Sequence, residues 1–414
     1  MTNEIVTGLD IGGTKVCTVV GHILPEKKQP EIIGYGCVPS VGLRKGVVVD
    51  IEETVSAISA SLEEAERMAG VPVDNAFVGV ESSTIQSQNS KGVIAISKSD
   101  GEITEDDVSR VIEAARAVSV PANREILHVI PRSYKVDDQE GIYDPIGMTG
   151  VRLEVEAHVI TASTPSIKNL TKCVYQAGLD IDELILGVLA SSRAILNKNQ
   201  KEVGVLVVDI GYSTTGVAVF EEGNILHTSV LPIGSSHVSN DIAIGLRTSI
   251  EIAEKVKLEE GCAVPGVIPE RERIDLKKYG VPEGVFVSKR EVAEIIEARM
   301  LEIFGMVADE LKKVGRDGML PAGVVVTGGG SQLLGAVDLA KEALRLPAQI
   351  GLPVNISGMV EKVNEDPRMV TAVGLMQWGA ESLVKGTTVN SPSVSGGGGD
   401  SFKKVKDWFG QFLP

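Results

Sequence analysis

Apolar residues along the chain follow two different periods, and the same order of patterns occurs twice. Short, nearly continuous apolar runs predict β-strands, whereas apolar residues at helical spacing predict one α-helix over 51–69 and another beginning near Val238. The strands predicted before these helices span 16–20 and 31–38 in the first half, and 216–220 and 225–231 in the second. Three antiparallel strands followed by a helix, present twice, predict a duplicated α/β fold with a ligand cleft where its halves meet.

The composition is that of an acidic globular protein. The 414 residues include 56 Asp and Glu and 40 Lys and Arg, which gives a formal net charge of −16. That charge argues against nucleic acid as a partner and against a general affinity for anionic membranes. No apolar run approaches the ~18 residues of a spanning helix, and the N-terminus carries no basic region before an apolar stretch. We therefore expect neither a transmembrane segment nor a signal peptide.

The cysteines and histidines give no sign of a metal site or of disulfide cross-links. The four cysteines (Cys17, Cys37, Cys173 and Cys262) contain no CxxC pair, and a chain of this length does not need disulfides to hold its core together. The five histidines show no metal-ligand spacing. We expect reduced thiols, a reducing cytoplasm and no transition-metal chemistry.

Two similar glycine turns each separate one apolar strand from the next. The first reads Asp10, Ile11, Gly12, Gly13, Thr14 and Lys15, and the second reads Asp209, Ile210, Gly211, Tyr212, Ser213, Thr214 and Thr215. Backbone N–H groups of such turns can converge on phosphate oxygens, and an Asp at a strand end can hold the water shell of Mg²⁺. The pair predicts a polyphosphate clamp, in which Lys15 either contacts phosphate or lies solvated at a strand edge. For either copy alone, an ordinary hairpin turn is the alternative.

A third glycine cluster has the arrangement of a phosphate or nucleoside site. A buried strand is predicted over 324–327, followed by the turn Gly328, Gly329, Gly330 and Ser331 and by a helix from Gln332 onward. Glycines let the backbone approach a ligand closely, and the N–H groups at a helix start are free to bind it. The chain has neither GxxxxGKS/T nor a GxGxxG after its first strand, so neither a P-loop nor a dinucleotide-binding fold is supported.

These turns resemble the two phosphate loops and the adenosine loop of the actin-like ATPase superfamily. Within that superfamily the chain resembles the FtsA family of bacterial cell-division proteins through nearly its whole length. The segments that carry this closer resemblance are 42–46, 124–131, 144–153, 253–257 and the carboxy-terminal tail. The resemblance implies an actin-like two-domain fold, ATP with Mg²⁺ in the interdomain cleft near Asp10 and Asp209, and self-assembly into actin-like filaments.

The resemblance also implies a division into subdomains. They are 1A (1–80, 161–202 and 368–384), an inserted 1C (81–160), 2A (203–246 and 319–367) and 2B (247–318), followed by a flexible linker (385–400) and an amphipathic membrane-targeting helix (401–414). Other division proteins are expected to bind through 1C.

Further site residues follow from the same resemblance. Glu254 and Lys257, three apart on one helix face, are expected to contact adenine and ribose, with an exposed ion pair as the alternative. The C-terminal peptide of the division tubulin FtsZ is expected to dock on 2B, where a solvated helix face is the alternative. The residues assigned to this groove are Lys289, Arg290, Val292, Ile295, Ile296, Arg299 and Ile303.

The chain departs from the superfamily pattern where hydrolysis would occur. Many relatives carry an Asp shortly after the second phosphate loop, but here that position is Gly216. The segment 186–190 before this loop contains neither the Gln nor the Glu that the superfamily uses, and only Ser191 and Ser192 follow. A hydroxyl is a poor base at neutral pH. We therefore expect tight ATP binding with slow hydrolysis, and the sequence identifies no catalytic residue.

The C-terminal tail changes character after a Gly, Ser, Thr and Pro-rich linker. In helical projection the apolar residues fall on one face, with lysines on its flanks and on the opposite side. The residues assigned to membrane contact are Phe402, Lys403, Lys404, Val405, Lys406, Trp408, Phe409, Phe412 and Leu413. Such a segment suits the bilayer interface, whereas a helix docked on its own domain is the alternative. The expected location is the cytoplasmic face of the inner membrane, at the division site.

The expected function is an ATP-dependent adaptor that tethers the FtsZ ring to the membrane during septum assembly, and at most a slow ATPase. Two other classes are compatible with the turns alone. The segment 10–15 also resembles the phosphate loop of ROK-type sugar kinases, but no Asn-Asp-rich catalytic turn accompanies it. A pilus-assembly scaffold of the PilM kind would share the fold but would have less reason for the amphipathic tail.

Overall fold

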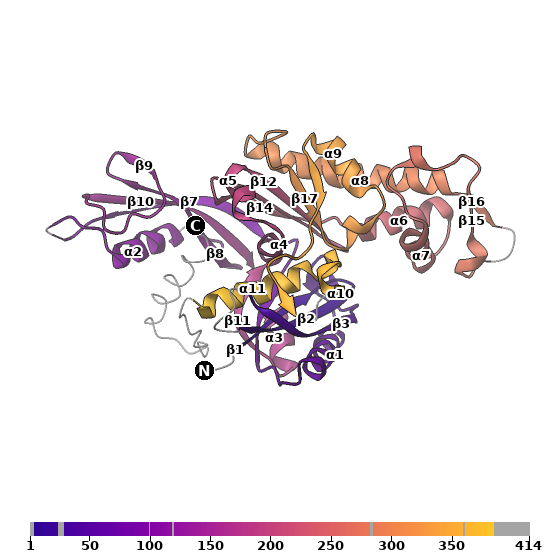
Figure 1. Ribbon diagram of the computed structural model, residues 1–414, viewed down its shortest axis with the longest axis horizontal. Helices are drawn as coiled ribbons and strands as arrows, with labels where there is room; N and C mark the ends of the chain where they lie inside the picture. The colour runs from indigo at the N-terminus through magenta and orange to yellow at the C-terminus, as the bar shows by residue number, and fades with distance from the viewer. Residues whose placement is uncertain are drawn as a thin grey trace.

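Two α/β halves, each extended by a smaller unit, make up the protein (Figure 1). The computed structural model describes residues 4–23, 29–98, 100–117, 120–281, 285–358 and 361–384. The predicted linker and tail helix, 385–414, lie outside the described residues, so the statements made about them remain predictions. Among the residues that the structure describes, no helix has the length and apolar character needed to cross a bilayer.

The first half is built on a six-stranded sheet. In sheet order its strands are β11 (Asp180–Leu186), β6 (Asn75–Val80), β1 (Glu4–Ile11), β2 (Lys15–Ile23), β3 (Glu31–Pro39) and β19 (Ser357–Gly358). β1, β2 and β3 form an antiparallel meander, whereas β6 runs parallel to β1. The predicted strands of this half are confirmed. One boundary differs, because β19 belongs to this sheet although its residues were assigned to 2A.

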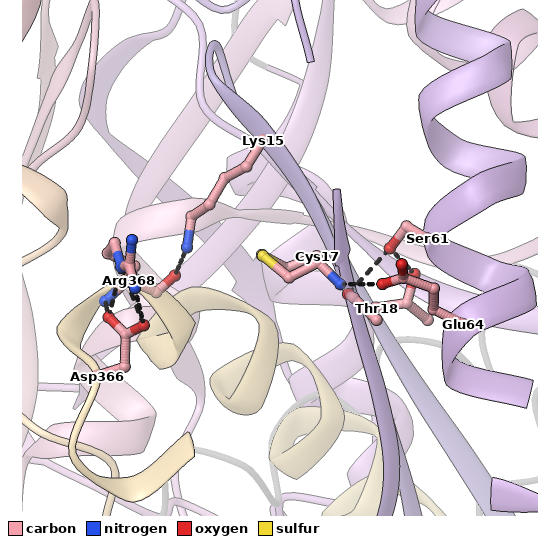
Figure 2. Close-up of a disulfide and its surroundings, with 9 residues drawn as sticks. Lys15, Cys17, Thr18, Ser61, Glu64, Asp366 and Arg368 are labelled. Carbon is pink, nitrogen blue, oxygen red and sulfur yellow. Dashed lines mark hydrogen bonds and ion pairs between the residues drawn. A yellow bond between two sulfur atoms is a disulfide. The ribbon is translucent and has the colours of Figure 1, made fainter. Parts of the chain in front are cut away.

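Helices cover both faces of the first sheet. α1 (Ile51–Ala69) packs on β2 and β3, where the Thr18 hydroxyl lies 2.8 Å from that of Ser61 (Figure 2). Asp50 caps the start of α1 by accepting from the Glu53 N–H, and Gly70 ends it in the left-handed conformation. On the other face lies α11 (Val370–Val384), which also contacts α4 (Gly187–Ile195). The remaining helix, α3 (Thr164–Gln176), lies beside α1.

The unit inserted in the first half has its own four-stranded sheet. Its strands, in sheet order, are β7 (Gln86–Ala95), β10 (Arg152–Ser163), β8 (Arg124–Val136) and β9 (Gln139–Ile142). α2 (Glu105–Arg116) packs on β7 and β10, and a reciprocal Thr104–Asp107 capping box fixes its start.

The second half repeats the strand plan of the first. Its sheet order is β14 (Asn224–Leu231), β13 (Thr215–Glu221), β12 (Val205–Ile210), β17 (Val324–Thr327) and β18 (Ala348–Ile350). α9 (Ala336–Leu344) packs on β17 and β18. The helix expected from Gln332 onward starts later, because a 3₁₀ turn over Gly329–Gln332 precedes it. α5 (Lys198–Val203) leads into β12, and the short α10 (Glu361–Asn364) precedes α11.

The small unit of the second half is mainly helical. It consists of α6 (Ser235–Leu246), α7 (Ile250–Glu260), α8 (Lys289–Lys313) and the strand pair β15 (Arg273–Asp275) and β16 (Phe286–Ser288). This unit and the inserted unit lie at opposite ends of the long axis of the molecule (Figure 1).

One cysteine pair differs from expectation. Cys17 on β2 and Cys37 on β3 are directly opposite each other in the antiparallel register and form a disulfide, beside Lys15 (Figure 2). The prediction of four reduced thiols is therefore wrong for this pair, because a cross-strand position brings together two residues that no short sequence motif connects. Cys173 and Cys262 are free and buried.

Candidate functional site

A cleft of about 970 Å³ lies between the two halves and contains most of the residues that the sequence assigned to nucleotide binding. The predicted residues that line it are Asp10, Gly12, Gly13, Thr14, Lys15, Asp209, Gly211, Tyr212, Ser213, Thr214, Lys257, Gly328, Gly329 and Gly330. Thr215, Glu254 and Ser331 do not line it. Thr215 donates to the Ile233 carbonyl and Ser331 to the Gly328 carbonyl, so these hydroxyls stabilise the turns from behind.

The two phosphate-loop candidates have the same internal geometry and face each other. Gly12 N–H donates to the Lys15 carbonyl, and Gly211 N–H donates to the Thr214 carbonyl, in both cases over 2.9 Å. A Cβ added at Gly13 would lie 3.4 Å from Ser213 Oγ, so the two turns approach within van der Waals contact. The duplication predicted from sequence therefore produces two equivalent backbone turns that converge on one space. Their approach fits a ligand that both turns hold at once.

Each turn carries a carboxylate at its base, half-buried at Asp10 and buried at Asp209. Burial raises the pKa of Asp10 to about 6, against a lowering by Lys15 and a further increase from Asp209. Burial also raises the pKa of Asp209, whose Oδ2 accepts hydrogen bonds from Ser191 Oγ at 2.6 Å and Thr371 Oγ1 at 3.2 Å. Two acids held close together and away from water form a site that a cation would stabilise.

Lys15 lies in the cleft but is not free in this conformation. Its Nζ donates to the Arg368 carbonyl over 2.6 Å, next to an ion pair between Arg368 and Asp366 (Figure 2). Burial lowers the pKa of Lys15 to about 8, and the charges of Asp10 and Asp366 act in the opposite direction. An ammonium group carries three N–H donors, so this bond leaves two of them for a phosphate in the cleft.

The third glycine cluster and α7 form another wall of the cleft. Gly328 has a φ of 80° and leaves no room for a side chain against Asp209, so glycine is required there. Lys257 is 5% exposed and donates to Glu254 Oε2 at 2.8 Å and to the Ser235 carbonyl at 3.2 Å. Burial lowers the pKa of Lys257. The ion pair between Lys257 and Glu254 is thus partly buried. Lys257 faces the cleft, and Glu254 orients its ammonium group.

Glu81 is a cleft residue that sequence reasoning missed. It directly follows β6, and its carboxylate lies against Gly187 at the start of α4 and Gly216 on β13. Burial raises the pKa of Glu81 well above its ordinary value, and the nearby Asp209 and Asp10 raise it further. The segment 186–190 and Gly216 supply no acid themselves, as the sequence indicates, but a carboxylate reaches them from a strand distant in sequence. An acid directly after an apolar strand, as at Asp10 and Asp209, was the available signal.

The acids of the cleft do not form a direct metal cage. Among the described residues, no group of three His, Cys, Asp or Glu side chains is arranged to hold a metal ion. The role predicted for Asp10 and Asp209, in which water molecules lie between carboxylate and cation, stays a prediction.

The docking groove assigned to α8 needs correction. Val292, Ile296 and Ile303 are each 0% exposed and belong to the core of the second half, so they offer no surface to a partner. The remaining assigned residues lie at or near the surface and are already paired or packed. Lys289 bridges Glu260 and Glu272, Arg290 pairs with Glu270, Arg299 binds Asp241 and Glu302, and Ile295 packs partly buried against this core.

The two halves, their shared cleft and the inserted unit define an actin-like fold. Solved structures with this fold include a chain of the PilM–PilN type IV pilus biogenesis complex, with a TM-score of 0.66 and 18% identity over 91% of this chain and 98% of that one. Another is MreB5 of Spiroplasma citri bound to ADP, with a TM-score of 0.54 and 14% identity over 94% of this chain and 99% of that one.

Sequence comparison gives the family within this fold. The model of the SHS2 domain inserted in FtsA matches residues 82–161, and the model of cell division protein FtsA matches residues 206–374. Cell division protein FtsA of Pseudomonas aeruginosa is 41% identical over 95% of this chain and 93% of its own length. That of Escherichia coli K12 is 35% identical over 98% and 97%. The chain belongs to the FtsA family of cell division proteins, which confirms the resemblance found in its sequence.

Proposed function

We propose that the protein binds ATP with Mg²⁺ in the interdomain cleft and acts as an adaptor that attaches the FtsZ ring to the cytoplasmic membrane. The observation that carries the proposal is the pair of equivalent glycine turns, with Gly13 facing Ser213 across the cleft. Membership of a cell division family supports the process in which such an adaptor acts. The MreB5 structures bound to ADP and to AMPPNP belong to proteins of the same fold, and they support a nucleotide as the ligand.

Different residues of the cleft would bind different parts of the ligand. Backbone N–H groups of the two turns would hold the phosphates, as glycine turns do elsewhere. Asp10 and Asp209 would accept hydrogen bonds from the water shell of Mg²⁺, and the cation would neutralise phosphate charge beside these acids. Lys257 and the Gly328–Gly330 turn, which also line the cleft, would contact the nucleoside, as the family resemblance implies.

Filament formation would connect nucleotide binding to membrane attachment. A single amphipathic tail of six apolar side chains supplies only weak, reversible binding after its ordering cost. A filament places many tails on one surface, so avidity multiplies their affinity without any new contact. ATP-dependent self-assembly would therefore control attachment to the inner face of the membrane.

FtsZ would dock on the helical unit of the second half. The accessible parts of the predicted groove are Lys289, Arg290, Ile295 and Arg299. The cationic groups of Lys289, Arg290 and Arg299 are paired with carboxylates of the protein. An acidic peptide would replace these carboxylates with its own, so its affinity would fall with added salt.

Three measurements test the proposal. Isothermal titration should give a saturable affinity for ATP·Mg²⁺ that falls when Mg²⁺ is removed. Immobilised FtsZ C-terminal peptide should retain the protein, and Arg290→Glu should weaken retention, whereas Lys312→Glu at the exposed far end of α8 should not. Absence of nucleotide binding would exclude the cleft assignment. Phosphorylation of hexoses in a coupled assay would favour the sugar kinase class, and a failure to retain FtsZ peptide would favour a scaffold of another assembly.

A further inference from the structure

We propose that Glu81 orients the water molecule that attacks the terminal phosphate of ATP in the interdomain cleft; this inference rests on the ATP-binding function proposed above. The starting observation is the position of the side chain. β6 runs parallel to β1, with Leu9 opposite Val78, so Glu81 emerges at the same edge of the sheet as Asp10. Glu81 therefore lines the cleft beside the first glycine turn.

Two glycines leave the space that the carboxylate fills. A Cβ added at Gly187 would lie 2.5 Å from Glu81 Oε2, and one added at Gly216 would lie 2.6 Å from Glu81 Oε1. Gly216 is opposite Asp209 in the β12–β13 ladder. The carboxylate of the first half thus reaches the base of the second glycine turn. It occupies the region where 186–190 and Gly216 themselves supply no acid.

The second observation is an oxygen without a partner. Glu81 Oε1 is buried and accepts no hydrogen bond from the described residues. Buried polar atoms in folded proteins are nearly always hydrogen-bonded, so an exception in a cleft indicates a group whose partner comes with a ligand or with water. A carboxylate repels a polyphosphate, which argues against a role in holding the phosphates themselves.

A water molecule bound by Oε1 is the partner that fits ATP chemistry. Catalysis of phosphoryl transfer consists mainly of positioning and charge stabilisation, and it needs a group that orients the attacking water. The water oxygen forms a new bond to the γ-phosphorus while the bond to the β–γ bridging oxygen breaks. ADP leaves with that oxygen; one proton of the water remains on the released phosphate and the other passes to solvent. Glu81 accepts a hydrogen bond throughout and is not consumed.

The test compares Glu81→Ala and Glu81→Gln with the unaltered full-length protein. We expect Glu81→Ala to slow single-turnover phosphate release by about 100-fold, the scale of a misplaced reactant. Glu81→Gln keeps an acceptor oxygen but loses its charge, and should slow release by about tenfold. Affinity for ATP·Mg²⁺, measured by titration, should not fall in either variant, because Glu81 does not hold the phosphates.

A matched control is available outside the cleft. Glu125 on β8 also has a buried Oε1 without a partner among the described residues, and it does not line the cleft. Glu125→Gln should leave both release and affinity unchanged. The isosteric Glu81→Gln decides the matter if Glu81→Ala fails to fold, as judged by thermal unfolding.

The outcomes separate this inference from the function on which it rests. Unchanged phosphate release in Glu81→Gln overturns the role of Glu81. So does a tenfold loss of ATP·Mg²⁺ affinity in either variant, which would assign the carboxylate to ligand or cation binding instead. An unaltered protein that binds ATP but releases no phosphate also overturns it, and leaves the nucleotide-binding function standing. If the unaltered protein binds no ATP, the proposed function itself fails.

Discussion

Ser191 on α4 donates a 2.6 Å hydrogen bond to Oδ2 of Asp209 at the end of β12, and so connects a helix that packs with the first half to the carboxylate of the second. Thr371 on α11 donates to the same oxygen at 3.2 Å. Two hydroxyls from the first half therefore hold an acid of the second half in place. Both bonds lower the pKa of Asp209 against the effect of its burial.

The first prediction concerns this bond. Ser191→Ala should weaken ATP·Mg²⁺ binding by roughly tenfold, because a hydrogen bond to a charged group is worth about 1.5–3 kcal/mol and Asp209 would be less firmly ionised and oriented. Isothermal titration at pH 7 measures the change. Ser192→Ala is the matched control, since its hydroxyl donates to the Val188 carbonyl within α4 and not to Asp209. Equal effects of the two substitutions would contradict the role given to Ser191.

The second prediction separates the nucleoside wall of the cleft from the phosphate turns. Lys257→Met preserves most of the buried side-chain volume but removes the ammonium group that binds Glu254. We expect it to lower ATP and ADP affinity by a similar factor of about ten, because the lost contact does not involve the terminal phosphate. Lys255→Met, on the exposed side of the same helix, should change neither affinity. A loss of affinity for ATP but not for ADP would show that Lys257 contacts the terminal phosphate instead.

The parts of the site that are formed by consecutive residues could be predicted from the sequence. Each glycine turn is a short segment whose hydrogen bond closes over three residues, as between Gly12 and Lys15, so its residues carry the whole signal. The repeated apolar pattern likewise identified the strands on either side of the turns. The helix after Gly330 was placed too early because Leu333 and Leu334 continue its apolar spacing, although they lie between a 3₁₀ turn and the start of α9.

The remaining parts depend on contacts between distant segments, which no periodicity reveals. Glu81 enters the cleft because β6 pairs beside β1, and Cys17 meets Cys37 because β2 and β3 share a register. The docking assignment failed for Val292 and Ile296 for a related reason. An apolar helix stripe predicts burial against something, but it does not tell whether the neighbour is the protein's own core or a partner.

The third prediction is a pH dependence of stability that comes from Glu310 on α8. Although burial opposes the shift, hydrogen bonds from His227 and Lys313 lower the pKa of Glu310 to about 2. A folded-state pKa below the unfolded one means that stabilisation is complete above the ordinary value of 4.5 and is lost as the pH falls toward 2. Glu310→Gln should therefore destabilise the protein by roughly 2 kcal/mol at pH 7, with a smaller difference from the unaltered protein below pH ~4.5.

Urea unfolding at a series of pH values tests this. Asp309→Asn is the matched control on the same helix, because its ion pair with Lys312 is exposed and should contribute at most about 1 kcal/mol. A stability difference for Glu310→Gln that stays constant from pH 7 to pH 3 would show that the loss is one of packing and not of the ionised hydrogen bonds.

The last prediction concerns the tail that the sequence assigns to the membrane. In the predicted helix Trp408 lies within the apolar arc and Gln411 just outside it, so Trp408→Glu and Gln411→Glu add the same charge inside and outside the apolar face. Trp408→Glu, like deletion of 401–414, should abolish co-sedimentation with anionic liposomes while ATP affinity stays unchanged. Gln411→Glu should retain most of the binding, because only the polar face is altered. ATP should increase sedimentation of the unaltered protein, since assembly brings many weakly binding tails to one surface. Equal sedimentation of Trp408→Glu and the unaltered protein would exclude this segment as the anchor.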